Sequence, residues 1–275
     1  MQLRGLFTIF LLGLLSTYSI GQTKLLTFNI RYDNKNDGPN WWEHRKGDVV
    51  QLLSENDPHI FGLQEALPHQ TKFIQKHLSN YKVVNYLRDG QDSKSEGLPV
   101  FWKNEALELV ASEVFWLSAT PNTVSKGWDA NLNRILVYCQ FKDKKDNSTL
   151  HVFNAHFDHL GTEARLKSAQ LILKIIKEKS LNDQKTIVMG DFNALPDSPP
   201  IHTLLKTLKD SADPVSAQQG TFTNFDIQKT AKNRIDYIFY KNLKIKNHEV
   251  ITTKRPNGLY PSDHFPIMIE IKKEP

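Results

Sequence analysis

Cysteine is nearly absent from this sequence: its 275 residues contain one, Cys139. A single thiol rules out an intrachain disulfide, so an apolar core must stabilise the fold. Cys139 lies in the apolar run 135–141, where a cysteine is usually a core residue rather than a nucleophile. Because the sequence also lacks a cysteine cluster and a closely spaced histidine pair such as HExxH, it disfavours zinc.

A long apolar run is missing as well. The most apolar stretch, residues 6–15, is shorter than the ~18 residues expected of a membrane span. It follows a basic start with Arg4 and precedes small residues at 19–21, which is the pattern of a secretory signal peptide. We therefore expect residues 1–21 to be a signal peptide and residues 22–275 to be exported, periplasmic or extracellular, without a membrane span. The alternative is an uncleaved membrane anchor.

The excess of charge of either sign is small. The net charge is +5. Arg4 is the only charged side chain in residues 1–21, so removal of that segment lowers the net charge to +4. This balance is compatible with a phosphate-bearing substrate, nucleic acid included, but is too small to indicate nucleic-acid binding by itself. The ordinary composition, 39% hydrophobic and 24% charged, predicts one globular domain over residues 22–275. We expect it to be a monomer.

The apolar patterning that is present alternates between strand-like and helix-like segments. Apolar and polar residues alternate in 26–31, as in a half-buried strand, and apolar residues recur at helical spacing in 163–179. The remaining predicted elements are a helix at 45–56 and strands at 60–63, 82–88, 98–102, 107–117, 134–141, 150–157, 186–189, 234–240, 245–253 and 265–271. Many strands with few helices predict two sheets packed face to face with helices outside.

Several predicted strands end in a carboxylate, an amide or an imidazole. The five segments concerned are TFNIRYDN (27–34), LQE (63–65), NAHFDH (154–159), GDFN (190–193) and SDH (262–264). Such endings are typical of a sheet that uses one edge for chemistry. Each segment alone also has a plainer interpretation, since a strand-end histidine is often structural and GDFN can form an Asx turn.

These residue types fit a metal-dependent enzyme. A hard cation such as Mg²⁺ needs one or two protein carboxylates and otherwise binds water and substrate phosphate, which Glu65 with Asn29, and also Asp263, can complement. In GDFN, Asp191 and Asn193 lie two positions apart and project to the same side. Such an acid can align or deprotonate a water, while the amide donates to a developing oxyanion.

In order and spacing, the motifs resemble the endonuclease/exonuclease/phosphatase superfamily. The matching motifs are Asn29, LQE (63–65), NAH (154–156), GDFN (190–193), RIDY (234–237) and SDHFP (262–266), within a resemblance that covers about residues 24–272. The resemblance implies an α/β fold, a four-layer αββα sandwich of two mainly antiparallel sheets. It also implies an enzyme that hydrolyses phosphoesters with Mg²⁺ or Mn²⁺. His156 stands where AP endonucleases of the superfamily use a tyrosine, so the chain is more similar to the deoxyribonuclease, deadenylase and phosphatase branches.

The resemblance also implies which residues bind metal and water. Asn29 and Glu65 would bind the metal, with Asp263 coordinating it or lying close by. Asp191 would orient or activate the attacking water, and Asn193 would contact phosphate.

Two histidines complete the implied site. His264, oriented by Asp236, would stabilise the transition state or act as the acid/base, and His156 would be a second phosphate-contacting histidine. Glu96 lies near where the family often places an acid that pairs with the residue at His156. Arg134 supplies a guanidinium where a phosphate oxygen could be held, although a surface salt bridge explains it equally well.

The substrate follows less directly. We expect hydrolysis of a phosphodiester, in nucleic acid or a small molecule, by in-line attack of an activated water. The alternatives are a phosphomonoesterase acting on sugar, inositol or nucleotide phosphates and a catalytically silent extracellular binding module. Trp41 and Trp42 can stack on a base or sugar, or one ring can cap the sheet while the other is half exposed. Segment 117–131, rich in Ser, Thr, Asn and Gly, predicts a long loop on the substrate side.

Overall fold

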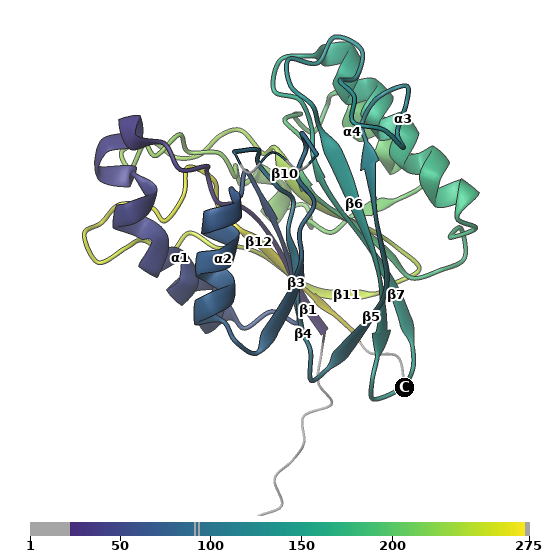
Figure 1. The fold of residues 1–275 in the computed structure, drawn as a ribbon, viewed down its shortest axis with the longest axis horizontal. Helices are drawn as coiled ribbons and strands as arrows, with labels where there is room; N and C mark the ends of the chain where they lie inside the picture. The colour runs from purple at the N-terminus through teal and green to yellow at the C-terminus, as the bar shows by residue number, and fades with distance from the viewer. Residues whose placement is uncertain (1–22, 91, 93, 273–275) are drawn as a thin grey trace, which may run out of the picture.

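The computed structural model describes residues 23–90, 92 and 94–272. The predicted signal peptide, residues 1–21, lies outside the described residues. Within the described ranges, every helix is too short or too polar to cross a bilayer. Figure 1 shows two sheets lying against each other, with helices on either side of the pair.

Two six-stranded sheets form the centre of the molecule, with strand orders β11-β12-β1-β2-β4-β3 and β5-β6-β7-β8-β10-β9. The first contains β1 (Thr23–Asn29), β2 (Ile60–Gln64), β3 (Tyr81–Val84), β4 (Val100–Lys103), β11 (Ile245–Val250) and β12 (Ile267–Ile271). The second contains β5 (Leu107–Trp116), β6 (Ile135–Asp143), β7 (Thr149–His156), β8 (Thr186–Asp191), β9 (Lys209–Asp210) and β10 (Asp236–Lys241). Among the described strands, β1 pairs with β2 and β7 with β8 in parallel, and the other neighbours are antiparallel. The prediction of two mainly antiparallel sheets is confirmed.

Helices cover the outer faces of both sheets (Figure 1). Helices α1 (Trp42–Asn56) and α2 (Pro68–His77) pack on the first sheet, and α3 (Thr162–Glu178) and α4 (Pro199–Leu205) pack on the second. A further apolar cluster fills the space between the sheets. Both faces of each sheet are therefore buried, which explains why β2 and β8 are buried along their whole length. The layers are helix, sheet, sheet and helix, as the resemblance implied.

Predicted and observed elements differ mainly at short helices and strand ends. The elements that the sequence patterns missed are α2, α4, β9 and the 3-10 helices η1 (Lys35–Asn40) and η2 (Ser216–Gln218). Helix α2 escapes detection because its buried face includes the polar Gln70 and Thr71, so a clear apolar period is absent. The strand predicted at 82–88 is wrong beyond residue 84, where β3 ends and Leu87 forms only an isolated bridge to Gly97.

The two parallel strand pairs decide where the polar strand ends meet. In β1-α1-β2 and β7-α3-β8, the helix returns the chain so that both strands of a pair end at the same edge. Asn29 ends β1 beside the end of β2, and His156 ends β7 opposite Asp191 of β8. Strand β10 runs antiparallel to β8 and begins at this edge, with Asp236 opposite Asp191. One edge of the sandwich thus collects residues from distant parts of the chain.

A buried amide pair joins the two sheets just below this edge. The side chain of Gln64 in β2 donates a 2.7 Å hydrogen bond to the amide oxygen of Asn154 in β7. The Asn154 amide donates in turn to the carbonyl oxygen of Leu63 at 3.1 Å. Gly62 makes room for this contact, because a Cβ there would lie 2.7 Å from the Asn154 side chain. Both amides are fully buried, so hydrogen bonds as well as packing fix how the sheets align.

Candidate active site

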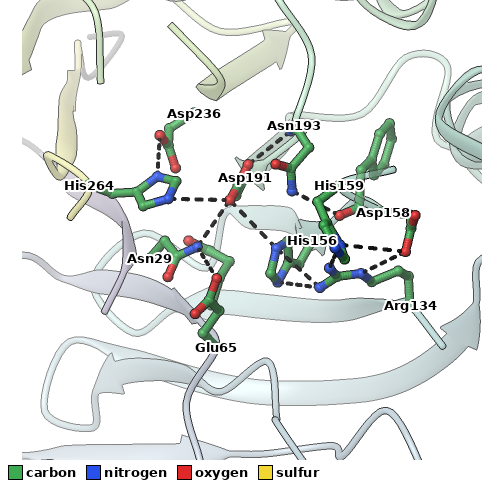
Figure 2. A network of polar contacts seen from close by, with 12 residues as sticks. Asn29, Glu65, Arg134, His156, Asp158, His159, Asp191, Asn193, Asp236 and His264 are labelled. Carbon is green, nitrogen blue, oxygen red and sulfur yellow. Dashed lines mark hydrogen bonds and ion pairs between the residues drawn. The ribbon is translucent and has the colours of Figure 1, made fainter. Parts of the chain in front are cut away.

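Asp191 is the centre of a polar network at this edge (Figure 2). Its Oδ2 accepts a hydrogen bond from Asn29 Nδ2 at 3.0 Å and lies 3.5 Å from His156 Nε2 and 3.8 Å from His264 Nε2. Its Oδ1 accepts a 2.9 Å hydrogen bond from the backbone N–H of Asn193. Residues from four of the sequence motifs therefore meet around one carboxylate.

The burial of Asp191 disfavours its ionised form, and its place in the fold depends on the preceding residue, Gly190. Burial, and next the charge of Asp236, raise the pKa of Asp191 to about 7. Gly190 has a φ of 142°, and a Cβ there would lie 1.9 Å from the carbonyl oxygen of Ala155 in β7. The glycine of GDFN therefore lets β8 approach β7 closely where Asp191 leaves the sheet.

The two histidines beside Asp191 have opposite electrostatic surroundings. His264 Nδ1 lies 2.9 Å from Asp236 Oδ2. Burial alone would lower the pKa of His264, but the charges of Asp236 and Asp191 raise it well above its ordinary value. Burial, and next the charge of Arg134, lower the pKa of His156 well below its ordinary value. The surroundings therefore favour the protonated form of His264 and the neutral form of His156.

Arg134, directly before β6, connects His156 with the loop that follows β7. Its Nη1 lies 2.9 Å from His156 Nδ1, its Nη2 lies 3.2 Å from His159 Nδ1, and its Nε lies 3.6 Å from Asp158 Oδ2. Arg134 is only 5% exposed, so the surface salt bridge considered for it is wrong. The arginine instead places a buried cation next to a neutral histidine, on one side of Asp191 (Figure 2).

Glu65 and Asn29 lie on another side of Asp191 (Figure 2). Asn29 Nδ2 donates to Glu65 Oε1 at 3.1 Å, and Glu65 Oε2 accepts from the backbone N–H of Tyr32 at 3.1 Å. The oxygen of the Asn29 amide accepts from the backbone N–H of Arg31 at 3.0 Å. In this orientation Asn29 is a donor between two acids and turns its oxygen away from them.

One cluster at the site offers metal-ligand atoms close together. Oxygen or nitrogen atoms of Asp191, Asp236 and His264 lie within 4.8 Å of one another, and all three residues are buried. The short contact between His264 and Asp236 already engages two of these three side chains.

A second set of carboxylates offers oxygen ligands alone. Glu65 Oε2 and Asp263 Oδ2 lie 4.0 and 3.9 Å from the guanidinium of Arg31, so both border the same small region. Burial raises the pKa of Asp263, although the nearby charges of His264 and Arg31 oppose the shift. Carboxylate oxygens of this kind match the ligand preference of Mg²⁺ and Mn²⁺.

The two adjacent tryptophans have different positions. Trp42 is 1% exposed and packs edge-on against Phe73 of α2, so its assignment as a substrate-binding residue is wrong. Trp41 is half-buried, and its indole N–H donates a 2.5 Å hydrogen bond to Asp33. The alternative, one ring in the core and one partly exposed, describes the structure.

Two further predicted residues make contacts that the motifs did not indicate. Glu96 accepts a 2.6 Å hydrogen bond from Arg88 Nη1, in place of the pairing with His156 that the resemblance implied. Glu96, Arg88 and His156 nevertheless line one narrow cleft. The amide of Asn193 donates to the carbonyl oxygen of Phe157 at 3.0 Å, which ties the GDFN turn to the end of β7.

Arg31 and Asp158 belong to the site but were not singled out from the sequence. Asp158 Oδ1 accepts hydrogen bonds from the backbone N–H groups of Leu160 and Gly161, at 3.0 and 2.8 Å, just before α3. An aspartate that accepts from backbone N–H groups two and three residues further on forms an Asx turn, which is a detectable local signal. Arg31 lies inside the TFNIRYDN motif, but nothing in the motif shows that its side chain turns back toward Glu65.

Comparison with known proteins agrees with this geometry. The sequence profile of the Endonuclease/Exonuclease/phosphatase family matches residues 26–264. A solved structure of a mannosyl-6-phosphatase from Bacteroides thetaiotaomicron is 31% identical, with a TM-score of 0.84 over 91% of this chain and 100% of that chain. Nocturnin from Drosophila melanogaster is 24% identical over 85% of this chain and 42% of its own length. A probable RNA exonuclease from Saccharomyces cerevisiae is 27% identical over 60% of this chain and 34% of its own length.

The chain spans between 34% and 59% of the length of the curated relatives it matches, whereas it covers nearly all of the mannosyl-6-phosphatase chain. The family match, in contrast, extends over most of the described residues and includes every motif of the network. Members of this family hydrolyse phosphate esters with a divalent metal, and the structure offers acidic groups that suit one. The chain thus belongs to the Endonuclease/Exonuclease/phosphatase family and is a metal-dependent hydrolase of phosphate esters.

Proposed function

We propose that this enzyme uses Mg²⁺ or Mn²⁺ and acts by in-line attack of a water on phosphorus. The observation that carries the proposal is the convergence of two buried histidines on Asp191, at 3.5 and 3.8 Å, with surroundings that shift their pKa values in opposite directions. Hydrolysis of a phosphate ester needs donors for the developing negative charge and a group that positions the attacking water. Neighbouring groups whose pKa values are pushed apart provide distinct acid and base roles within one site.

Each residue of the network then has a definite role. Asp191 orients the attacking water and accepts its proton, and its raised pKa suits proton transfer near neutral pH. Protonated His264, held by Asp236, donates to the phosphoryl oxygens as charge develops. Neutral His156 and the Arg134 guanidinium hold the phosphate from the opposite side.

Asn193 retains a possible contact with phosphate. Its side-chain NH₂ has two N–H donors, and Phe157 accepts one of them. The residue is half-exposed at the mouth of the network, so its second donor is available to a phosphate oxygen.

We assign the divalent cation to Glu65 and Asp263. The cluster that includes Asp236 is less suited, because His264 Nδ1 already contacts Asp236 at 2.9 Å and the raised pKa of His264 disfavours the neutral imidazole that a metal needs. Asn29 becomes a ligand only if its amide turns over, because its NH₂ group, and not its oxygen, faces Glu65 and Asp191. When bound, the cation neutralises charge on the phosphate and the leaving group.

For the substrate, we propose a phosphate monoester of a small hydroxylated molecule such as a sugar. A monoester carries one more negative charge than a diester, and the buried cations Arg134 and His264 flank Asp191 where that charge would lie. The burial of Trp42 removes the adjacent-ring platform that a nucleobase would use. The similarity to a mannosyl-6-phosphatase along nearly its whole chain supports the same choice.

A phosphodiester is the second candidate. It was the expectation from the motifs, and the similarity to a probable RNA exonuclease favours it. The phosphate group of a monoester and that of a diester differ in charge and size beside His156. The kcat/KM values for the two substrate classes therefore distinguish the candidates.

A substrate panel tests both. The purified enzyme would be stripped with EDTA, reloaded with Mg²⁺ or Mn²⁺, and assayed on mannose 6-phosphate, inositol phosphates, p-nitrophenyl phosphate, bis-p-nitrophenyl phosphate and short DNA and RNA strands. A higher kcat/KM for monoesters supports the phosphatase. Faster cleavage of a diester or a nucleic acid overturns it in favour of a nuclease. Absence of turnover with every metal would leave a silent binding module as the better explanation.

Export is also part of the proposal and rests on the sequence of residues 1–21. Expression of the full chain in a bacterial host, fractionation and N-terminal sequencing test it. We expect a processed protein that begins at Gln22 outside the cytoplasm. Recovery of the intact N-terminus in the membrane fraction would favour an anchor instead.

A further inference from the structure

Arg31 is anchored from outside the network. It lies two residues after Asn29, and its Nε and Nη2 each lie 3.1 Å from a carboxylate oxygen of Asp37, as a two-bond fork. Asp37 is itself held by the amide of Asn34, which donates to it at 3.0 Å. The position of the guanidinium is therefore set by the loop after β1, independently of what occupies the site.

The same guanidinium also lies beside the two acids assigned to the metal, through Nη1, which Asp37 does not bind, and through Nε, which also donates to Asp37. Arg31 Nη1 lies 4.0 Å from Glu65 Oε2, and Arg31 Nε lies 3.9 Å from Asp263 Oδ2. At these distances the interaction is electrostatic rather than a direct hydrogen bond. The backbone N–H of Arg31 also holds the oxygen of Asn29. One residue thus contacts or faces all three positions predicted to bind metal.

The backbone supports this arrangement at some cost. Arg31 has a φ of 57° and Glu65 a φ of 60°, both in the left-handed region that residues other than glycine rarely adopt. Two such residues at facing strand ends are typical of a functional site, where the surrounding structure enforces a strained conformation.

We infer that Arg31 is a positioning residue that sets the affinity of the site for its divalent cation. Its fixed positive charge offsets one of the two negative charges of Glu65 and Asp263, so the cation is bound less tightly than the two carboxylates alone would bind it. Asp37 prevents the guanidinium from moving onto either acid and blocking the site. The inference rests on the proposed assignment of the cation to Glu65 and Asp263.

Two substitutions within one ion pair should change metal affinity in opposite directions. Arg31→Met removes the competing charge, and we expect Mn²⁺ to bind about tenfold more tightly. Asp37→Asn releases the guanidinium toward Glu65 and Asp263, and we expect Mn²⁺ to bind several-fold more weakly. Mn²⁺ titration calorimetry of the full folded enzyme, without substrate, measures both changes. Thermal melts in EDTA show whether each variant is folded.

Matched variants identify the cause. Lys35→Met removes the same charge from the same loop, from an exposed side chain outside the network, and should leave Mn²⁺ affinity within about twofold. Arg31→Lys keeps the charge but cannot form the two-bond fork with Asp37, so Mn²⁺ should bind no more tightly than to the unsubstituted enzyme. Tighter binding in Arg31→Met alone supports the inference. Weaker or unchanged binding in a folded Arg31→Met variant overturns it.

Glu65→Gln separates this inference from the proposed metal assignment. Loss of Mn²⁺ binding in that variant keeps the assignment, so that any failure of the Arg31 variants concerns Arg31 alone. Retention of full Mn²⁺ affinity in Glu65→Gln would instead show that the cation lies elsewhere, and both statements would fall.

Discussion

Substitution of Asp191 by asparagine should inactivate the enzyme and stabilise it. Raising the pKa of a buried carboxyl from 3.8 to about 7 opposes its ionisation by about 4 kcal/mol, since each tenfold change in acidity is worth about 1.4 kcal/mol. The amide removes this penalty, but its NH₂ group must face one of the two N–H donors that the carboxylate accepts, from Asn29 and Asn193, which costs about 2 kcal/mol. The net gain is about 2 kcal/mol, or roughly 4 to 8 °C in Tm for a domain of this size.

The pH dependence of this gain has a definite sign. The carboxyl of Asp191 ionises near pH 3.8 in the unfolded chain and near pH 7 in the folded chain. Between these values the unfolded state releases a proton that the folded state retains, so the enzyme loses stability as the pH rises through this window. Asp191→Asn has no such proton. The difference in Tm between variant and parent should therefore grow from pH 4 to pH 7 and level off above.

Two measurements check this prediction. Thermal melts across pH 4 to 8 in EDTA give the stability difference, and steady-state kinetics with Mg²⁺ or Mn²⁺ should show a loss of kcat on the order of a thousandfold or more. Asp197→Asn is the matched control, because Asp197 is an exposed aspartate in the same segment. The reasoning fails if Asp191→Asn melts below the parent at pH 8, if the difference is independent of pH, or if turnover is retained.

Three further predictions concern the surroundings of the site. Asp236→Asn removes the carboxylate that holds His264, so kcat should fall on the order of a hundredfold to ten-thousandfold with little change in KM, and unaltered kinetics would exclude the proposed acid role. Burial would raise the pKa of Asp158, but backbone N–H donors lower it to about 2. Its contribution, about 1 to 3 kcal/mol, should be complete above pH 3.8 and lost as the pH falls through 2, so urea unfolding of Asp158→Asn and parent should converge in acid. Trp42→Ala should cost about 3 to 5 kcal/mol and Trp41→Ala far less, and similar melting temperatures for the two would contradict the burial of Trp42.

The fold was readable from the sequence where burial leaves a clear pattern. Strands β1 and β7 and helix α3 follow apolar periods of two or 3.6, and their ends fall within a few residues of the predicted ones. Helix α4 was missed because it has seven residues and starts with two prolines, so it lacks a full amphipathic repeat. The sequence also did not show that Trp42 is buried and Trp41 partly exposed. Local sequence does not specify which of two neighbouring residues at the start of a helix faces the core.

The candidate site was readable as a set of residues but not as a set of contacts. Motif order identified Asp191, His156 and His264, and the structure brings them together because the parallel strands β7 and β8 end at the edge where β12 begins. Partners that depend on side-chain direction were not readable. Glu96 turns to Arg88, since no local pattern specifies which buried cation an acid will meet.

The geometry of the site depends on contacts below it as much as on the residues that line it. Glu65 comes from the first sheet and His156 from the second, and no backbone hydrogen bond joins these sheets within the described strands. The buried amide pair of Gln64 and Asn154 is one position from Glu65 and two from His156, and it fits only because Gly62 has no side chain. Apolar packing alone tolerates small sliding of one sheet over the other, whereas sliding would break the buried hydrogen bond between the two amides and leave both groups unpaired. The distance across which metal ligands and phosphate-binding groups face each other is therefore specified within the core, by side chains that never reach the substrate.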